Sequence, residues 1–587
     1  MKLGRAVSGW LSPLVLLLAH GVGAAPHSAG FANYHPSPLY TERVSDTFFL
    51  SMRDGVRLAV RVSRPSRDGQ PVDGRFPVIW THALTISEGA PTRNFGIESS
   101  YRDIPSLTAY GYVVAQVARR GNGESFGIRR GYNDRTEAYD AYEVTEWLAT
   151  QPWSTGAVGI YGCSNTGDAS MHALTVAPPH LKAAFAGCFS WNKWDAFHRG
   201  GIYAQWGVGP QRTIDLDMQL EPVAGDSSRV LLRQAAEEHQ QSTDLASLWH
   251  GMPYRDSWST LVTSRFWYEG SISSYADQLR RSGIALYIQG GWHDELRDQG
   301  LIALLNLPGS HILIGPWKHC QSPDFQLLQE IHRFFDTYLK SIDTGLRTEK
   351  RIHYYTINAA AGAEWRSAST WPLPDMRPQR LFLGGNGLLT SHVSGPAKRE
   401  FVVNTHVTCP NDKAGVAVQP CHVPGEGMSY TGDILQQDLE VTGNAVINLH
   451  LSTDRTDASV FAYLEDVAPD GSITDVTEGR LKASLRASTE APYRLPGTPW
   501  HRGWQQDAQP LIPGEAVTLT FDIMPTSYVF RAGHRLQLTV TGSDFRETLR
   551  DTTAEGSRIT LLSDPAQPSY LDLPAIADNH NSTRGRS

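Results

Sequence analysis

Short runs of apolar residues recur along the first 350 residues, and longer amphipathic stretches separate them. The runs fall at 76–80, 112–117, 157–161, 183–188, 284–289 and 311–315. Between two of them, residues 137–150 place apolar side chains roughly at helical spacing. Strands that alternate with helices predict βαβ units and a buried, mostly parallel sheet. Residues 46–64 alternate apolar and polar positions around Arg53-Asp54-Gly55, which predicts a β-hairpin.

Two regions depart from this alternation. Residues 190–280 contain polar helical stretches such as 229–241 but no clear strand, which predicts an inserted, mostly helical cap. Residues 351–575 contain many β-rich runs separated by turns, among them 445–451, 460–467, 516–523, 535–541 and 559–562. That pattern is typical of an all-β sandwich or jelly roll.

The first residues have the pattern of a secretory signal. Lys2 and Arg5 precede an apolar stretch over 11–19, and small residues follow at 22–25. The apolar stretch is too short for a stable membrane span. We therefore expect cleavage after about residue 24 and a secreted or periplasmic protein without membrane attachment. An uncleaved N-terminal anchor is the alternative.

Composition and charge exclude several classes of protein. Hydrophobic residues make up 40% and charged residues 19% of the 587 residues, which is typical of a globular protein. The formal charge is −8 and the chain has no run of Lys and Arg, so nucleic acid is not an expected partner. No group of Cys and His has zinc-binding spacing, and we expect no metal or organic cofactor.

The five cysteines are few for so long a chain, and an oxidising compartment would allow disulfides. Cys409 and Cys421 flank a short polar loop and are the best candidate pair, because closing so short a loop would stabilise the fold by roughly 3 kcal/mol. Cys163, Cys188 and Cys320 cannot all pair among themselves. We expect one of these three to be a buried, inert thiol.

A candidate nucleophile, Ser164, lies within Ile-Tyr-Gly-Cys-Ser-Asn-Thr-Gly at 160–167, between a predicted strand and a helix-like stretch from Asp168. A sharp strand-to-helix turn would present its hydroxyl above the sheet edge, and glycines would avoid a Cβ clash there. The N–H groups that begin the helix would face a developing oxyanion. The match to G-x-S-x-G is imperfect, because Thr166 holds the second Gly position and Gly167 comes one later. A plain Gly-rich turn is the alternative.

A catalytic Ser needs a base, and the base needs an orienting carboxylate. Asp294 follows the predicted strand 284–289, and His319 follows the next one, 311–315. The order Ser, Asp, His and the placement at the C-terminal ends of strands are those expected of a triad on a parallel sheet. Glu295 or Asp298 is the alternative acid. His293 or His311 is the alternative base, although His311 stands at the start of its strand.

These motifs together resemble the serine hydrolase family that includes cocaine esterase, α-amino-acid ester hydrolases and X-prolyl dipeptidyl peptidases (the CocE/NonD type). The resemblance covers nearly the whole mature chain. Four of its segments are Arg-Gly-Asn-Gly-Glu-Ser-Phe-Gly at 120–127, the turn around Ser164 at 160–167, Gly-Trp-His-Asp at 291–294 and Gly-Pro-Trp-Lys-His at 315–319. Further matches lie at 147–153, 334–336 and 528–535.

The resemblance implies an α/β class of fold: an α/β-hydrolase domain with an inserted helical cap and a C-terminal jelly roll. By position it makes Ser164 the nucleophile, Asp294 the orienting acid and His319 the base. The expected organisation is a signal peptide, a split α/β-hydrolase domain, a cap, a jelly-roll domain and a tail, at 1–24, 25–190 with 281–350, 191–280, 351–575 and 576–587.

Two departures from the family concern the oxyanion hole. Members usually carry Tyr directly after the nucleophile, whereas this chain has Asn165. Its backbone N–H can still donate to the oxyanion. The family's second donor is a Tyr phenol, and the corresponding position here is Thr85. Either Thr85, His82 or a backbone N–H replaces the phenol, or the oxyanion hole is weakened.

Other charged residues bear on the substrate. The α-amino-acid ester hydrolases carry carboxylates two and three residues after the catalytic Asp, where this chain has Leu296 and Arg297. A cationic α-amino substrate is therefore disfavoured. Arg297 either is structural or favours an anionic substrate. Arg119 and Arg120 are expected to pair with buried acids such as Asp140 rather than to bind a substrate carboxylate.

The sequence thus predicts a secreted serine hydrolase that cleaves a small-molecule carboxylic ester, or an amide, through an acyl-enzyme. It assigns no oligomeric state. An X-prolyl dipeptidyl aminopeptidase is one alternative. A non-catalytic binding protein on a hydrolase scaffold is another, supported only by the altered oxyanion loop.

Overall fold

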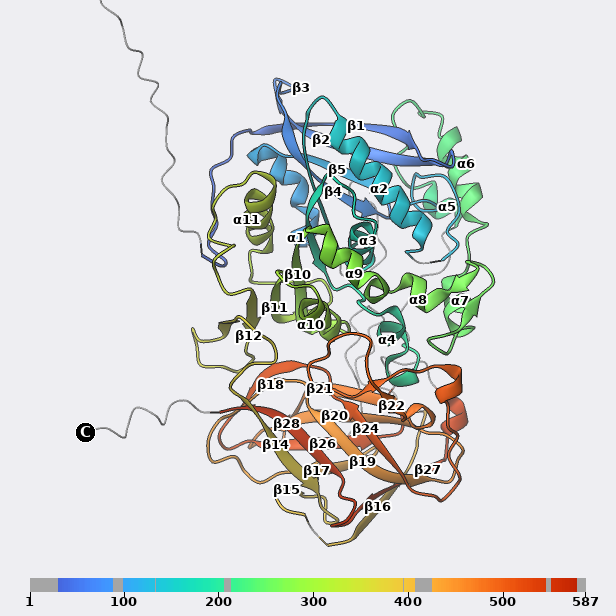
Figure 1. Ribbon diagram of the computed structural model, residues 1–587, viewed down its shortest axis with the longest axis vertical. Helices are drawn as coiled ribbons and strands as arrows, with labels where there is room; N and C mark the ends of the chain where they lie inside the picture. Colours follow the sequence, from blue (N-terminus) through green and yellow to red (C-terminus); the bar gives the residue numbers. More distant parts are fainter. Residues whose placement is uncertain are drawn as a thin grey trace, which may run out of the picture.

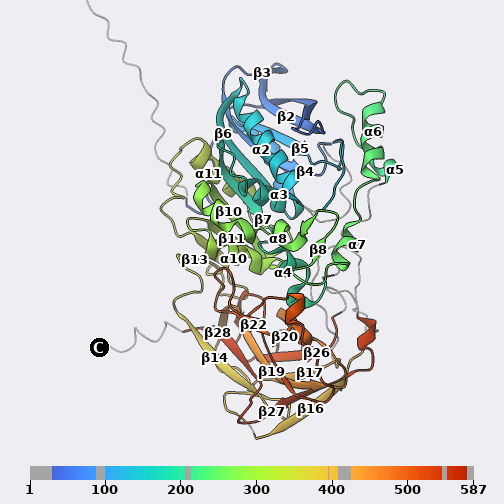
Figure 2. The same ribbon diagram turned by 45° about the vertical axis from the view of Figure 1, so that its right-hand side comes forward.

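The computed structural model describes residues 30–87, 99–131, 133–204, 213–393, 395–406, 425–544 and 551–577. The predicted signal peptide and the Cys409–Cys421 pair lie outside these residues. Within them, no helix combines the length and the apolar character needed to cross a membrane. Figures 1 and 2 show an α/β part and a C-terminal β domain stacked along the long axis of the molecule.

The described residues of the α/β part form a mixed sheet of 11 strands in the order β1-β2-β5-β4-β6-β7-β10-β11-β12-β13, with β3 beside β2. The strands from β5 to β12 in this order run parallel, and β1 and β2 form the predicted hairpin. Their bounds are Glu42–Ser51, Arg57–Arg67, Gln70–Pro71, Phe76–Ala83, Val113–Ala118, Ser154–Cys163, Leu181–Gly187, Ala285–His293, His311–Lys318, Ile352–Tyr355 and Trp365–Ala368 for β1–β7 and β10–β13.

Both faces of this sheet are covered by helices, because its central strands are apolar at successive positions. Val78 and Trp80 point to one face, and Ile79 points to the other. The first face packs against α2, α3, α9 and α10, which are Arg135–Thr150, Asn165–Leu174, Ala276–Ser282 and Arg297–Asn306. The second packs against α1, the 3-10 helix η1 and α11, which are Ser99–Arg102, Ile104–Tyr110 and Leu327–Leu339.

The region predicted as a cap consists mainly of short helices. Aromatic side chains hold it together, and Trp194, Trp249 and Trp267 share a buried cluster with Leu485 of the β domain. The described elements between β7 and α9 are α4 Lys193–Phe197, η2 Arg199–Gly201, α5 Ile214–Asp217, α6 Val230–His239, α7 Leu245–His250, β8 Trp258–Ser259, β9 Ser264–Arg265, α8 Phe266–Gly270 and η3 Ile272–Tyr275.

The β domain places one apolar core between a nine-stranded and a four-stranded sheet, counted over its described residues. β19 alternates buried and partly exposed positions throughout its length, whereas β20, β25 and β26 are buried at successive positions. The bounds of β14–β21 and β24–β28 are Met376–Leu383, Leu389–Thr390, Ala397–Val402, Met428–Thr431, Leu439–Gly443, Val446–Thr453, Ser459–Val467, Ile473–Lys482, Val517–Asp522, Thr526–Phe530, Arg535–Thr541, Arg558–Ser563 and Tyr570–Ile576. The small pair β22 and β23 is Ser488–Thr489 and Trp500–His501.

Candidate active site

Ser164 stands at a sharp turn between β6 and α3. Its backbone adopts φ 57° and ψ −126°, a conformation that costs a non-glycine residue about 1–3 kcal/mol. Its N–H donates to the carbonyl of Gly187 at 3.0 Å, and its carbonyl accepts from the N–H of Asp168 at 2.8 Å. The predicted strand-to-helix turn is therefore present, and the surrounding backbone holds it in a strained conformation.

The glycines around Ser164 are required by close backbone contacts. A Cβ on Gly162 would lie 2.2 Å from the carbonyl oxygen of Thr166, and one on Gly167 would lie 2.3 Å from that of Gly187. The Thr166 hydroxyl accepts from the N–H of Cys163 at 2.9 Å and donates to its carbonyl at 2.8 Å. Thr166 thus closes the turn in place of the motif's second glycine, and Gly167 takes the tight contact one position later.

Substitution of Gly162 by Ala should therefore disrupt this turn. Backbone atoms would have to move to admit the Cβ, so we expect a loss of about 3 kcal/mol of stability and a thermal midpoint lower by roughly 2 to 5 °C, because the shift per kcal/mol is small in a chain of this length. Gly290→Ala is the matched control on β10, since its Cβ would meet only the Ile314 side chain at 3.6 Å. Thermal unfolding of both variants tests this; equal midpoints would contradict the geometry.

His319 follows β11, and its ring faces two carboxylates. Nδ1 lies 3.2 Å from Asp294 Oδ1 and 3.0 Å from Glu295 Oε1. All three side chains are buried, at 8%, 1% and 4% exposure. Nδ1 can donate to either acid, which leaves Nε2 as the nitrogen with the chemistry of a general base.

Asp294 is held in its ionised form. Burial works against its charge, but the neighbouring His319 and hydrogen bonds from His319, Cys188 and the Leu296 N–H outweigh it and lower the pKa of the carboxyl. The Leu296 N–H donates to Oδ1 at 2.7 Å. Asp294 thus has the fixed negative charge that an orienting acid needs.

Three further side chains that the sequence allowed as acid or base lie in different surroundings. Asp298 pairs with Arg199, with Oδ2 and Nη2 2.6 Å apart, and therefore serves a different ion pair. His311 begins β11, at the opposite end from His319. His293 ends β10, where burial, with Arg297 and Lys318 nearby, lowers its pKa to about 4.

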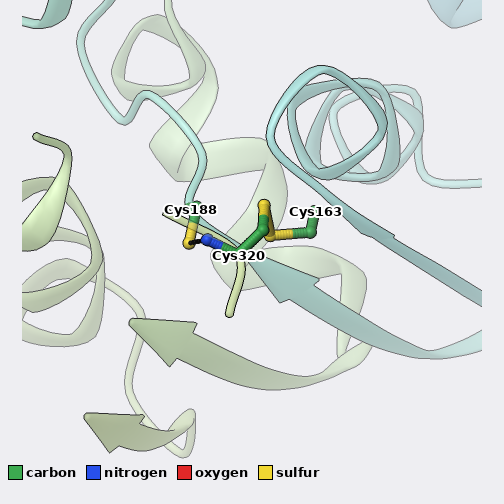
Figure 3. Close-up of side chains that lie close together, drawn as sticks. All are labelled: Cys163, Cys188 and Cys320. Atoms are coloured by element: carbon green, nitrogen blue, oxygen red, sulfur yellow. Dashed lines mark hydrogen bonds between the residues drawn. A yellow bond between two sulfur atoms is a disulfide. The ribbon is translucent and has the colours of Figure 1, made fainter. Parts of the chain in front are cut away.

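The four strands that end at this site are neighbours in the sheet. β6, β7, β10 and β11 are adjacent and parallel, and they lead into Ser164, Cys188, Asp294 and His319 at the same edge. A disulfide joins Cys163 to Cys320, with 6.0 Å between their Cα atoms (Figure 3). Since neighbouring Cα atoms are about 3.8 Å apart, those of Ser164 and His319 are at most about 14 Å apart.

This disulfide was not predicted, although a buried thiol among the three cysteines was, and Cys188 is that thiol. Burial, and the nearby charge of Asp294, raise the pKa of Cys188 well above its usual value. A signal for the pair was present in the sequence. Cys163 precedes the candidate nucleophile and Cys320 follows the candidate base, so any fold that brings Ser164 to His319 also brings these cysteines together.

The sequence offered Thr85, His82 or a backbone N–H as the second donor to the oxyanion. The Thr85 hydroxyl donates its hydrogen to Glu124 Oε1 at 2.8 Å, which disfavours it as a donor to an oxyanion. His82 is buried, and its Nε2 has no hydrogen-bond partner among the described residues. Asn165 is the first residue of α3, where backbone N–H groups lack helical partners, and its side-chain oxygen accepts from Arg119.

The arginines singled out from the sequence are in structural ion pairs. Arg120 binds both oxygens of Asp140 at 2.6 and 2.7 Å, as predicted. Arg119 pairs with Glu137 at 3.1 Å. Arg297 is buried and pairs with Glu478 of the β domain at 2.6 Å. The Arg297 charge is thus neutralised within the protein, which argues against its role in holding an anionic substrate.

A cavity of about 350 Å³ lies between the cap region and the β domain. Its lining includes Tyr203, His250, Phe461, Lys482 and Asp544. None of the candidate catalytic residues lines this cavity, so the cavity is not part of the candidate active site.

Comparison with known proteins identifies the two parts of the chain. Residues 54–321 match the family described as X-Pro dipeptidyl-peptidase (S15 family), and residues 344–572 match the X-Pro dipeptidyl-peptidase C-terminal non-catalytic domain. A Mycobacterium tuberculosis protein provisionally named a serine esterase is 28% identical, over 86% of this chain and 91% of its own. The cocaine esterase of a Rhodococcus strain is 23% identical, over 91% of this chain and 98% of its own.

Solved structures agree on the fold. A CocE/NonD family hydrolase from Staphylococcus aureus has a TM-score of 0.71 at 20% identity, covering 92% of this chain and 94% of that one. An α-amino-acid ester hydrolase has a TM-score of 0.67 at 18% identity, covering 96% and 100%.

The fold is that of an α/β hydrolase with a C-terminal β domain, and the chain is a serine hydrolase. It belongs to the family that includes cocaine esterase and the X-prolyl dipeptidyl peptidases, as the sequence motifs indicated. The comparisons support an esterase or a dipeptidyl peptidase without choosing between them.

Proposed function

We propose that this protein is an exported serine hydrolase that cleaves a carboxylic ester, or an amide, through an acyl-enzyme. Ser164 is the nucleophile, His319 the general base and Asp294 the acid that orients the base. The carrying observation is that His319 Nδ1 faces buried carboxylates beside the turn that presents Ser164. The elbow glycines and the strand order at this edge support the same assignment.

The reaction follows from these positions. His319 Nε2 takes the Ser164 proton as Oγ attacks the carbonyl carbon, and the imidazolium is stabilised by Asp294. The Asn165 N–H stabilises the oxyanion. The imidazolium then protonates the leaving alcohol or amine, which departs and leaves an ester between Ser164 and the acyl group. His319 next removes a proton from water, whose oxygen attacks the acyl carbon; the bond from that carbon to Ser164 Oγ then breaks, the imidazolium returns the proton to Oγ, and the acid is released.

Export is supported by the N-terminal signal pattern and by the Cys163–Cys320 disulfide, since disulfides persist in oxidising compartments. The cap region and the β domain, which we propose to be a jelly roll, would shape the acyl and leaving-group pockets. No part of this proposal requires a metal or organic cofactor.

Esters are favoured over X-Pro peptides. The positions where α-amino-acid ester hydrolases carry carboxylates hold Leu296 and Arg297, and Arg297 is paired with Glu478. The site region therefore offers no carboxylates at these two positions to hold an α-ammonium group. The X-Pro alternative rests on the description of the matching family.

A substrate panel distinguishes the two activities. We expect the mature protein to hydrolyse short p-nitrophenyl esters and to release no p-nitroaniline from an X-Pro anilide. Release from the anilide with the esters left intact would instead establish the dipeptidyl peptidase. A fluorophosphonate probe should label wild-type protein but not Ser164→Ala; failure to label the wild type would favour a non-catalytic binding protein.

A further inference from the structure

The disulfide connects the two residues that adjoin the candidate nucleophile and base. Cys163 is the last residue of β6 and precedes Ser164, whereas Cys320 directly follows His319. The two are 157 residues apart in sequence. Figure 3 shows the bond lying between the two segments, with Cys188 beside it. Each end of the disulfide is therefore only one residue away from a candidate catalytic residue.

The backbone is strained at Ser164, at Cys320 and at the neighbouring Cys188. Ser164, Cys188 and Cys320 have φ values of 57°, 46° and 52°, in the left-handed region that non-glycine residues rarely adopt. Strained backbone of this kind persists only where the surroundings impose it. At Cys320 the surroundings are the disulfide and a hydrogen bond from its N–H to Cys188 Sγ at 3.2 Å.

Gln289 contacts both the disulfide and the free thiol of Cys188. Gln289 Oε1 lies 3.8 Å from Cys163 Sγ and 3.6 Å from Cys188 Sγ, and Cys188 N–H donates to the Gln289 carbonyl at 3.1 Å. The three sulfur atoms lie within 4.8 Å of one another. A Cys188 thiolate would exchange with so close a disulfide. Burial and the nearby charge of Asp294 raise the pKa of Cys188, which disfavours the thiolate that such exchange requires.

We propose that the Cys163–Cys320 disulfide is a positioning element for catalysis, which holds the turn of Ser164 in register with the turn of His319. The inference rests on the proposed function, because it takes Ser164 and His319 as the reacting pair. Neither cysteine touches the substrate. A shift of about 1 Å between nucleophile and base costs on the order of 100-fold in rate, so loss of the bond should lower kcat by roughly 10- to 100-fold and leave KM within about threefold.

The double variant Cys163→Ala, Cys320→Ala tests this with p-nitrophenyl acetate. Activity is measured well below the thermal midpoint of the variant, with circular dichroism to establish that it is folded. Both kcat and the rate of fluorophosphonate labelling should fall together, because both report the activation of Ser164. The matched control is Cys409→Ala, Cys421→Ala, which removes two cysteines that adjoin neither candidate catalytic residue and should retain kcat.

Reduction of the wild-type protein provides a second measurement if the double variant does not fold. A phosphine and water supply the two electrons and two protons that convert the disulfide into two thiols. Alkylation and mass spectrometry of the peptides containing Cys163 and Cys320 identify the reduced molecules. We expect a separate, unalkylated aliquot to lose kcat on reduction and to regain it when the phosphine is removed and oxidised glutathione takes up the two electrons and two protons as the disulfide forms again.

A full kcat in the folded double variant or in the reduced protein would overturn the inference, even if the thermal midpoint fell, because the bond would then serve stability alone. Ser164→Ala separates this outcome from failure of the proposed function. If that variant is inactive while the double variant is fully active, only the role of the disulfide is wrong. If Ser164→Ala hydrolyses the ester normally, the proposed function itself is wrong.

Discussion

Replacement of Ser164 by Ala should lower kcat for ester hydrolysis by at least about 10⁴-fold, and His319→Ala should have a similar effect. The two residues act as one unit, because the hydroxyl is a weak nucleophile until an imidazole removes its proton. The double variant should therefore be hardly worse than either single variant. Steady-state kinetics with p-nitrophenyl acetate measure all three, with thermal unfolding to establish that each remains folded.

Thr166 and His311 provide comparisons for these variants. Thr166→Ser keeps the hydroxyl that closes the turn and should stay active, and His311→Ala removes an imidazole at the start of β11, the strand whose other end leads into His319. We expect both to keep most of the wild-type kcat. Equal losses in His311→Ala and His319→Ala would mean that the effect reflects the fold and not the base.

The central strands of the α/β sheet could be predicted because each contains a short run of consecutive apolar residues. The apolar run at 76–80 lies within β4, and the run at 284–289 lies within β10 except for its first residue, as their composition indicated. Strand partners were harder to assign. β12 and β13 extend the α/β sheet past residue 350, where the sequence pattern predicts the β domain to begin. A short β-rich run does not by itself specify which of two sheets it joins.

The strand-to-helix turn around Ser164 could be predicted, because the residues that form it are consecutive in the sequence. Thr85 could not be judged in this way, because its hydrogen bond to Glu124 spans 39 residues. The paired state of Arg297 was hidden for the same reason, since Glu478 is 181 residues away. Side-chain partners of this kind depend on tertiary packing and have no local pattern.

The sequence left open whether Asp294 or Glu295 is the acid that orients His319. Asp294 and Glu295 are consecutive, and both carboxylates reach His319 Nδ1, with the Glu295 oxygen nearer by 0.2 Å (3.0 against 3.2 Å). A difference this small does not decide between them. Asp294 has two further supports, namely the N–H of Leu296 on Oδ1 and a lowered pKa that keeps it charged.

Asp294→Asn should therefore lower kcat by about 10³- to 10⁴-fold, because an amide accepts the Nδ1 hydrogen less well and favours the wrong tautomer of the base. Glu295→Gln should cost about tenfold or less. The two substitutions are matched, since each replaces one carboxylate by its isosteric amide beside the same ring. Their pH–rate profiles supply a second readout, because removal of the acid that stabilises the imidazolium should lower the apparent pKa of the base.

The reverse order of effects would transfer the role of orienting acid to Glu295. A large loss in both variants would mean that the two carboxylates share the imidazolium charge, and the double variant would then fall no further than the worse single one. Either result would leave His319 as the proposed base, since both carboxylates lie near the same ring nitrogen, Nδ1. Only full activity of both variants and of their combination would remove the carboxylates from the mechanism.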